Sequence, residues 1–196
     1  MRAVVLSVAH SWRAYGAYNR KVGLKEYDVS LRATEACAAV LRQHDCPIGI
    51  VDAGDNGAKE YARIKTEVIN AINPSLAVEI HCNASQDSTA NYGEVIHHPS
   101  SPIGMRAAVC VSDMLRNALG NTKHLWPWHG AREWKPQFDQ HQFFFLSRTN
   151  CPSIIVEGLF LSNDEQAAWL ASSGGAEAYG ALVGDGIVKF LEQEQL

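Results

Sequence analysis

The sequence contains no long apolar run, no excess of basic residues and no pair of closely spaced cysteines. No apolar segment approaches the roughly 20 residues that a membrane-spanning helix requires. A net charge of −4 over 196 residues gives no indication that nucleic acid or an anionic membrane is a partner. We therefore expect no nucleic-acid binding and no stable membrane association.

The cysteines do not suggest a metal knuckle or a disulfide framework. They are odd in number and widely spread, and none belongs to a Cys-x-x-Cys pair. We expect buried, reduced side chains at Cys37, Cys46, Cys82, Cys110 and Cys151.

The N-terminal segment lacks the features of a secretory signal peptide. The apolar stretch at residues 3–9 is short, and no Ala-x-Ala cleavage site follows it. Cleavage there would also remove His10, which is a candidate functional residue. We expect the protein to be made in the cytoplasm.

Internal repeats, low-complexity tracts and linkers are also absent, so residues 1–196 are expected to form a single domain. Short apolar runs alternate with longer helical patterns, which predicts a layered α/β fold. Strands are expected at residues 3–9, 48–51, 76–80, 94–97 and 153–156. Helices are expected at residues 27–44, 58–72, 102–119, 164–171 and 176–194. An irregular surface loop is expected at residues 121–142, and either a strand or a short helix at residues 143–146.

Polar side chains directly follow three of the predicted strands. These are His10, His81 and Glu157. In open α/β sheets, functional sites gather at the carboxyl ends of the strands. These three residues, although far apart in the sequence, are therefore expected to lie close together at the carboxyl ends of the strands.

Two of these residues, together with Glu26, offer the donor set of a catalytic zinc site. His10, Glu26 and His81 supply two imidazoles and a carboxylate, and zinc lowers the pKa of bound water toward neutrality. Amide hydrolysis also needs a side chain that transfers protons. Glu157 suits this role, because it directly follows an apolar strand and its carboxylate is expected to be buried. Ordinary interpretations also exist: a loop histidine for His10, a helix-start acid for Glu26 and a core histidine for His81.

Four segments of the chain, in order, resemble motifs of the zinc-dependent N-acetylmuramoyl-L-alanine amidases (amidase type 3). This family is found in bacterial wall hydrolases and phage endolysins. The segments are LSVAH at residues 6–10, GLKEYDVSL at 23–31, VEIHCNA at 78–84 and PSIIVEGLFLSNDEQAAWL at 152–170.

The resemblance implies that His10, Glu26 and His81 bind Zn²⁺ and that Glu157 is the catalytic acid and base. The implied substrate is the amide bond between N-acetylmuramic acid and the L-alanine of the stem peptide in peptidoglycan. The implied fold is a twisted, mostly parallel β-sheet of about six strands, flanked by helices on both faces.

The resemblance also implies a monomeric catalytic domain without a separate cell-wall-binding domain. Lacking a signal peptide, the chain resembles a phage or prophage endolysin that is made in the host cytoplasm and acts on the wall after release. Two positions depart from the family. Ser11-Trp12 follows the first histidine in place of glycine, so Trp12 is a candidate for narrowing the cleft or stacking on a sugar. Asp52-Ala53-Gly54-Asp55 stands where the family often has arginine.

Several other polar and aromatic residues are interpreted mainly as structural. Because adjacent strand residues point to opposite faces, His97 and His98 do not suit one metal, and we interpret them as surface or partner residues. Ser162-Asn163 suits a helix cap. In the segment 121–142, exposed loop histidines are expected at His124, His129 and His141.

Two further features of residues 121–142 each have two possible interpretations. Trp126 and Trp128 suit either a platform for sugar or peptide, or core packing. Arg132 suits either a stem-peptide carboxylate or an exposed, solvated position.

Two alternative functions remain open from the residues. One is another zinc amidohydrolase or carboxypeptidase that acts on a soluble peptide or acylamino acid. The other is a non-catalytic wall-binding module.

Overall fold

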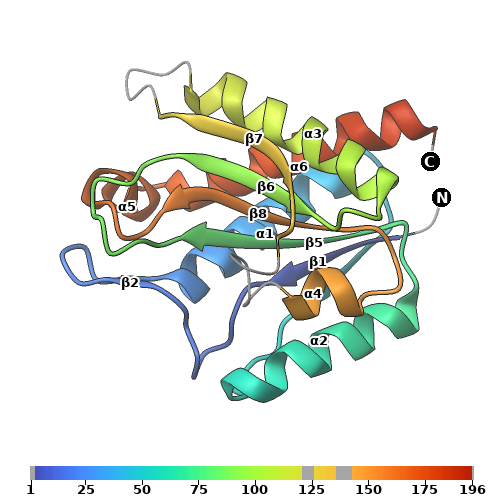
Figure 1. Ribbon diagram of the computed structural model, residues 1–196, viewed down its shortest axis with the longest axis horizontal. Coiled ribbons are helices and arrows are strands. Elements are labelled where there is room, and N and C mark those ends of the chain that lie inside the picture. The colour runs from blue at the N-terminus through green and yellow to red at the C-terminus, as the bar shows by residue number, and fades with distance from the viewer. Residues whose placement is uncertain (1–2, 121–125, 136–142, 196) are drawn as a thin grey trace.

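A computed structural model describes residues 3–120, 126–135 and 143–195. Within these residues, a six-stranded sheet forms the centre of the protein, and Figure 1 shows its place between the helices. Its strands, in spatial order, are β4 (Ile48–Val51), β1 (Val4–Val8), β5 (Leu76–Asn83), β8 (Ser153–Phe160), β6 (Gly93–His97) and β7 (Trp128–Glu133). The first four are parallel, whereas β6 is antiparallel to β8 and parallel to β7. The predicted α/β class and mostly parallel sheet are confirmed.

Helices cover both faces of the sheet (Figure 1). One face carries α1 (Glu26–Gln43), α3 (Pro102–Leu115) and α6 (Gly175–Glu194), and the other carries α2 (Ala58–Ile72) and α4 (Phe143–Arg148). Three smaller elements are α5 (Asp164–Ala171), a π-helical turn (Arg116–Gly120) after α3, and a hairpin of β2 (Tyr18–Asn19) and β3 (Leu24–Lys25). Among the described residues, no helix is both long and apolar enough to cross a membrane.

Two hydrophobic cores lie between the sheet and these helices. Val4 and Leu6 of β1 belong to the larger core under α1, α3 and α6, whereas Val5 belongs to the smaller core under α2 and α4. This is the alternation that a β-strand imposes. The close packing of α6 on α1 requires glycine at position 180, where a Cβ would lie 2.0 Å from the carbonyl oxygen of Ala33.

Two strands extend further than the apolar pattern predicts. β5 continues to Asn83 and β8 to Phe160, so His81 and Glu157 lie within strands instead of just past their ends. Apolar runs mark only the part of a strand that is packed on both faces. The polar residues that follow keep the strand conformation because the ladder between β5 and β8 continues through them.

The segment predicted as an irregular loop contains a strand, and that prediction was wrong for residues 128–133. β7 is an edge strand that pairs with β6, and it contains Gly130 and charged residues. Edge strands carry such residues often, which hides them from pattern reading. Residues 143–146, left undecided, belong to α4. All five cysteines are free, four are buried as expected, and Cys151 is half-buried.

Candidate functional site

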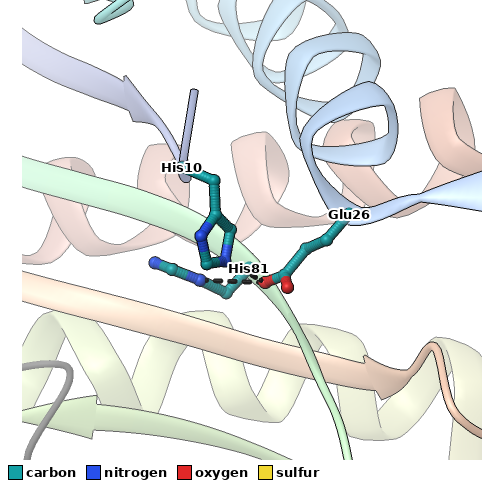
Figure 2. Close-up of side chains that lie close together, drawn as sticks. All are labelled: His10, Glu26 and His81. Carbon is teal, nitrogen blue, oxygen red and sulfur yellow. Dashed lines mark hydrogen bonds and ion pairs between the residues drawn. The ribbon is translucent and has the colours of Figure 1, made fainter. Parts of the chain in front are cut away.

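Three side chains from distant parts of the sequence meet near the carboxyl ends of the interior strands β1 and β5. Figure 2 shows His10, Glu26 and His81 pointing toward one another, and their ligand-type atoms all lie within 4.8 Å of one another. His10 Nε2 and His81 Nδ1 are each 3.0 Å from the same oxygen, Oε1 of Glu26. The structure thus brings together the three residues that the sequence analysis put forward as metal ligands.

The backbone holds each of these residues in a defined way. His10 follows β1 in the left-handed region, with φ of 63°, a conformation that costs energy for a residue with a Cβ and is found at functional sites. Glu26 is the first residue of α1, where the helix dipole favours a negative charge. Its Oε2 accepts the N–H of Ala17 at 2.8 Å, and its Oε1 accepts the N–H of Cys82 at 3.1 Å.

Electrostatics favour positive charge where the three side chains meet. Burial alone would raise the pKa of Glu26, but its contacts with His10 and His81 outweigh burial and lower this pKa to about 2. Burial alone would lower the pKa of His81, but Glu26 and Glu79 outweigh it and raise this pKa well above its usual value of 6.5. A carboxylate that stays ionised beside two imidazoles suits a cation.

We expect protein kept free of divalent metal to be most stable between about pH 4.5 and pH 6.5. The pKa of Glu26 drops from 4.5 to about 2 on folding, so its contribution is complete above pH 4.5 and is lost as the pH falls toward 2. The pKa of His81 rises on folding, so its contribution is complete below pH 6.5 and is lost as the pH rises through the folded value.

Thermal denaturation in the presence of a chelator measures both limbs of this pH profile. Glu26→Gln should flatten the acid limb, because the substituted side chain does not titrate. A melting temperature of the metal-free protein that climbs steadily above pH 6.5 would contradict the expected alkaline limb.

Glu157 lies beside this cluster. It is the register partner of His81 in the parallel ladder between β8 and β5, so the two side chains lie on the same face of the sheet. Its side chain is buried, with 5% of the residue exposed. On the other side, the register partner of Glu157 is Glu94 of β6. A row of ionisable side chains therefore crosses three strands next to the cluster.

Comparison with known protein families identifies the family to which the chain belongs. The sequence profile of the N-acetylmuramoyl-L-alanine amidases matches residues 4–189, almost the entire chain. The chain belongs to this amidase family. The reaction is therefore hydrolysis of the amide bond between N-acetylmuramic acid and L-alanine in peptidoglycan.

Solved structures of amidases share the fold. AmiC2 of Nostoc punctiforme is 24% identical, with a TM-score of 0.80 and 97% of each chain covered. The CwlD amidase of Clostridioides difficile, solved with the GerS lipoprotein, is 19% identical, with a TM-score of 0.82 and coverage of 98% of this chain and 100% of the other. The catalytic domain of the CD27L endolysin, which targets Clostridia difficile, is 19% identical, with a TM-score of 0.75 and coverage of 96% and 98%. Curated protein sequences gave no match.

In this amidase, Arg132 is engaged by a carboxylate of the protein itself. Its Nε and Nη2 donate to the two oxygens of Glu94 at 2.7 and 2.9 Å, and Glu94 is buried. Such a bidentate pair is strong and geometrically specific. The two positions expected for Arg132 were beside a substrate carboxylate or exposed to solvent. The pair instead neutralises the carboxylate next to Glu157.

A β-bulge lies directly after Glu157, and a buried tyrosine hydroxyl spans it. The register of β5 and β8 shifts between His81 and Asn83. At this point the hydroxyl of Tyr179 donates to the carbonyl of His81 and accepts the N–H of Gly158, both at 3.0 Å. Bulges beside active sites re-aim side chains. Tyr179 thus fixes the strand geometry on both sides of the bulge.

We expect Tyr179→Phe to lower the free energy of unfolding by about 1–3 kcal/mol, because buried backbone groups lose their hydroxyl partner. Chemical denaturation measures this change. Tyr18→Phe is the matched control: Tyr18 is exposed, so its loss of a hydroxyl should change stability by less than about 0.5 kcal/mol. Equal effects of the two substitutions would contradict a role at the bulge.

Three of the other histidines singled out in the sequence make contacts within the protein. Interpreting His97 as a surface residue was wrong: it is 4% exposed, and its Nδ1 faces the carbonyl of His98. His98 is half-buried and stacks on Trp134 with ring centroids 5.8 Å apart. His129 is exposed, as expected, and stacks on Tyr92 at 3.9 Å. His124 and His141 lie outside the described residues.

Two tryptophans that were candidates for a substrate platform pack against the protein. Trp126 is buried and meets Trp169 edge-on at 5.7 Å, and Trp128 donates from its indole nitrogen to Ser112 Oγ at 2.6 Å. Trp12, in contrast, is 57% exposed, and Lys25 Nζ lies 4.7 Å from its ring centroid.

Asn163 caps α5, as predicted.

Two charged residues next to the cluster, Glu79 and Lys65, were not predicted from the sequence. Glu79 lies two positions before His81 on the same strand, so the two side chains share a face of the sheet. A carboxylate inside the otherwise apolar run at residues 76–80 was the available signal. Lys65 gave no signal, because it is one of several charged residues in the sequence of α2.

Proposed function

We propose that His10, Glu26 and His81 hold a zinc ion and that Glu157 moves protons during hydrolysis of the muramoyl–L-alanine amide. The observation that carries this proposal is the convergence of two imidazole nitrogens on one carboxylate oxygen, at 3.0 Å each, beside a buried glutamate. Two imidazoles and one carboxylate form a typical donor set of catalytic zinc, which keeps a further position for water or substrate.

The chain itself prepares this site for a cation. Backbone N–H groups of Ala17 and Cys82 fix the carboxylate of Glu26, and the contacts described above keep that carboxylate ionised. Zinc, when bound, supplies Lewis acidity that activates water and polarises the scissile carbonyl. The protein's part is to orient the donor atoms and to hold the proton-transfer group nearby.

Glu157 supplies that proton transfer. A general base takes a proton from the attacking water, and the same carboxyl then gives a proton to the leaving nitrogen of L-alanine. The burial of Glu157 beside His81, and the neutralisation of the adjacent Glu94 by Arg132, support this role. A carboxyl with little water around it suits both halves of such a transfer.

We also propose that the enzyme acts as a monomer on the wall, as a phage or prophage endolysin. All proposed site residues come from one chain, and the catalytic domain of an endolysin shares the fold. Expression in a bacterial cytoplasm should therefore cause lysis only after the membrane is permeabilised. Light scattering of the purified protein should give the mass of one chain, 21.5 kDa.

Digestion of purified sacculi tests the proposed chemistry. We expect new free amino groups on L-alanine, together with one bound zinc ion per chain by elemental analysis. Release of a different amino-terminal residue would indicate another zinc peptidase. Binding to sacculi without any release of fragments would indicate a wall-binding module.

A further inference from the structure

A lysine is buried beside the proposed zinc site. Lys65, on the inner face of α2, is only 1% exposed. Its ammonium lies 2.9 Å from Oε1 of Glu79 and donates to the carbonyl of Val8, near the end of the strand that leads into His10. Burying an ammonium group is costly unless the charge is paired and its protons are bonded. Both conditions are met here.

The two oxygens of Glu79 have different neighbours. Oε1 accepts from Lys65 Nζ and from Ser7 Oγ, each at 2.9 Å. Oε2 lies 3.0 Å from Nε2 of His81. The carboxylate therefore connects the buried lysine to an imidazole of the three-residue cluster.

The opposite nitrogen of the same ring faces the cluster, since Nδ1 of His81 is 3.0 Å from Glu26 Oε1. A neutral imidazole carries one N–H and one lone pair. When Nε2 carries the hydrogen and donates it to Glu79, the lone pair of Nδ1 points toward His10 and Glu26. A metal-binding histidine commonly donates a hydrogen bond from the N–H of its second ring nitrogen to a carboxylate, which fixes the tautomer and the ring orientation.

We propose that the buried Lys65–Glu79 pair positions the side chain of His81. The pair sets the tautomer of this imidazole and thereby strengthens zinc binding. This inference rests on the proposed zinc site. Lys65 reaches both parts of the site: through Glu79 it orients His81, and through the carbonyl of Val8 it restrains the chain just before His10.

A purely structural ion pair would behave differently. Replacing a buried ion pair with apolar residues of similar size often leaves stability unchanged or raises it. The double variant Lys65→Met/Glu79→Met should therefore lose less metal-free stability than Glu79→Gln, which leaves the Lys65 ammonium buried without a carboxylate. If the pair positions His81, the same variant should bind zinc about 10–100-fold more weakly, as removal of such a partner does.

The experiment measures zinc affinity of the full chain by competition with a chelator, and the metal-free melting temperature, in four proteins. These are the unmodified chain, Glu79→Gln, the double methionine variant, and Glu177→Gln. The last removes a carboxylate from the exposed Arg32–Glu177 pair and should change neither quantity. Both variants at position 79 should lose zinc affinity. NMR of the imidazole nitrogens, in metal-free protein at a pH high enough to leave His81 neutral, should show its proton on Nε2 in the unmodified chain and a mixture of tautomers in the double variant.

The outcomes separate this inference from the proposed function. No zinc binding by the unmodified chain would overturn the proposed metal site, and this inference with it. Normal zinc affinity in the double variant, with the unmodified chain binding zinc, would overturn the positioning role alone. Zinc affinity that falls in both variants, while the double variant remains the more stable of the two, supports the inference.

Discussion

Replacing Glu157 with glutamine should lower kcat for hydrolysis of the muramoyl–L-alanine amide by about 10²–10⁴-fold, the usual contribution of a general acid or base. Glutamine has nearly the same shape as glutamate but neither accepts nor releases a proton at this step. Glu157 is not among the three side chains that converge on one point. Zinc content should therefore stay at one ion per chain.

The kinetics of this variant distinguish proton transfer from substrate binding. Loss of an interaction made only in the transition state lowers kcat and kcat/KM together, whereas loss of ordinary binding raises KM. Glu192→Gln, at an exposed position of α6, is the matched control and should retain full activity. Full lytic activity in Glu157→Gln would exclude the proposed mechanism. A variant that loses zinc would show that Glu157 acts on the metal site instead.

The sequence was sufficient to predict the sheet class and the residues that converge, for a physical reason. Apolar runs of the interior strands reveal the parallel sheet, and polar residues at the ends of those runs mark its functional edge. His10 and His81 follow such runs, whereas Glu26 begins α1 and was put forward for its donor type and the family resemblance. The three side chains meet in the structure. The sequence did not indicate where the strands end, because polar residues within the site remain in the β-ladder.

The supporting interactions were less predictable than the cluster itself. Glu94 is buried and pairs with Arg132 of the neighbouring strand β7, which carries no apolar alternation. Tyr179 reaches the bulge from α6, almost a hundred residues after His81. These contacts depend on how the helices and edge strands pack, and local patterns carry no record of such packing.

A single added methyl group at Gly16 should damage the site strongly. Gly16 has φ of +74°, and a Cβ there would lie 2.3 Å from Glu26 Oε2 and 2.5 Å from His10 Nε2. Carbon and oxygen or nitrogen normally stay more than 3 Å apart, so Gly16→Ala must move both side chains by about 1 Å. A displacement of that size in a catalytic site costs about 10²-fold in rate. We expect kcat/KM to fall by this factor, with a parallel loss of zinc affinity.

Gly23 provides the control that separates this contact from backbone strain. It lies in the turn between β2 and β3, and its φ of +68° is similar, but a Cβ there would meet nothing within 4 Å. Alanine at either position must adopt a left-handed backbone conformation, which costs roughly 1–2 kcal/mol. Only Gly16→Ala should also lose zinc affinity and activity. If both substitutions reduced zinc affinity equally, loop strain would be the cause. The close approach of the Gly16 backbone to His10 and Glu26 would then not be what shapes the site.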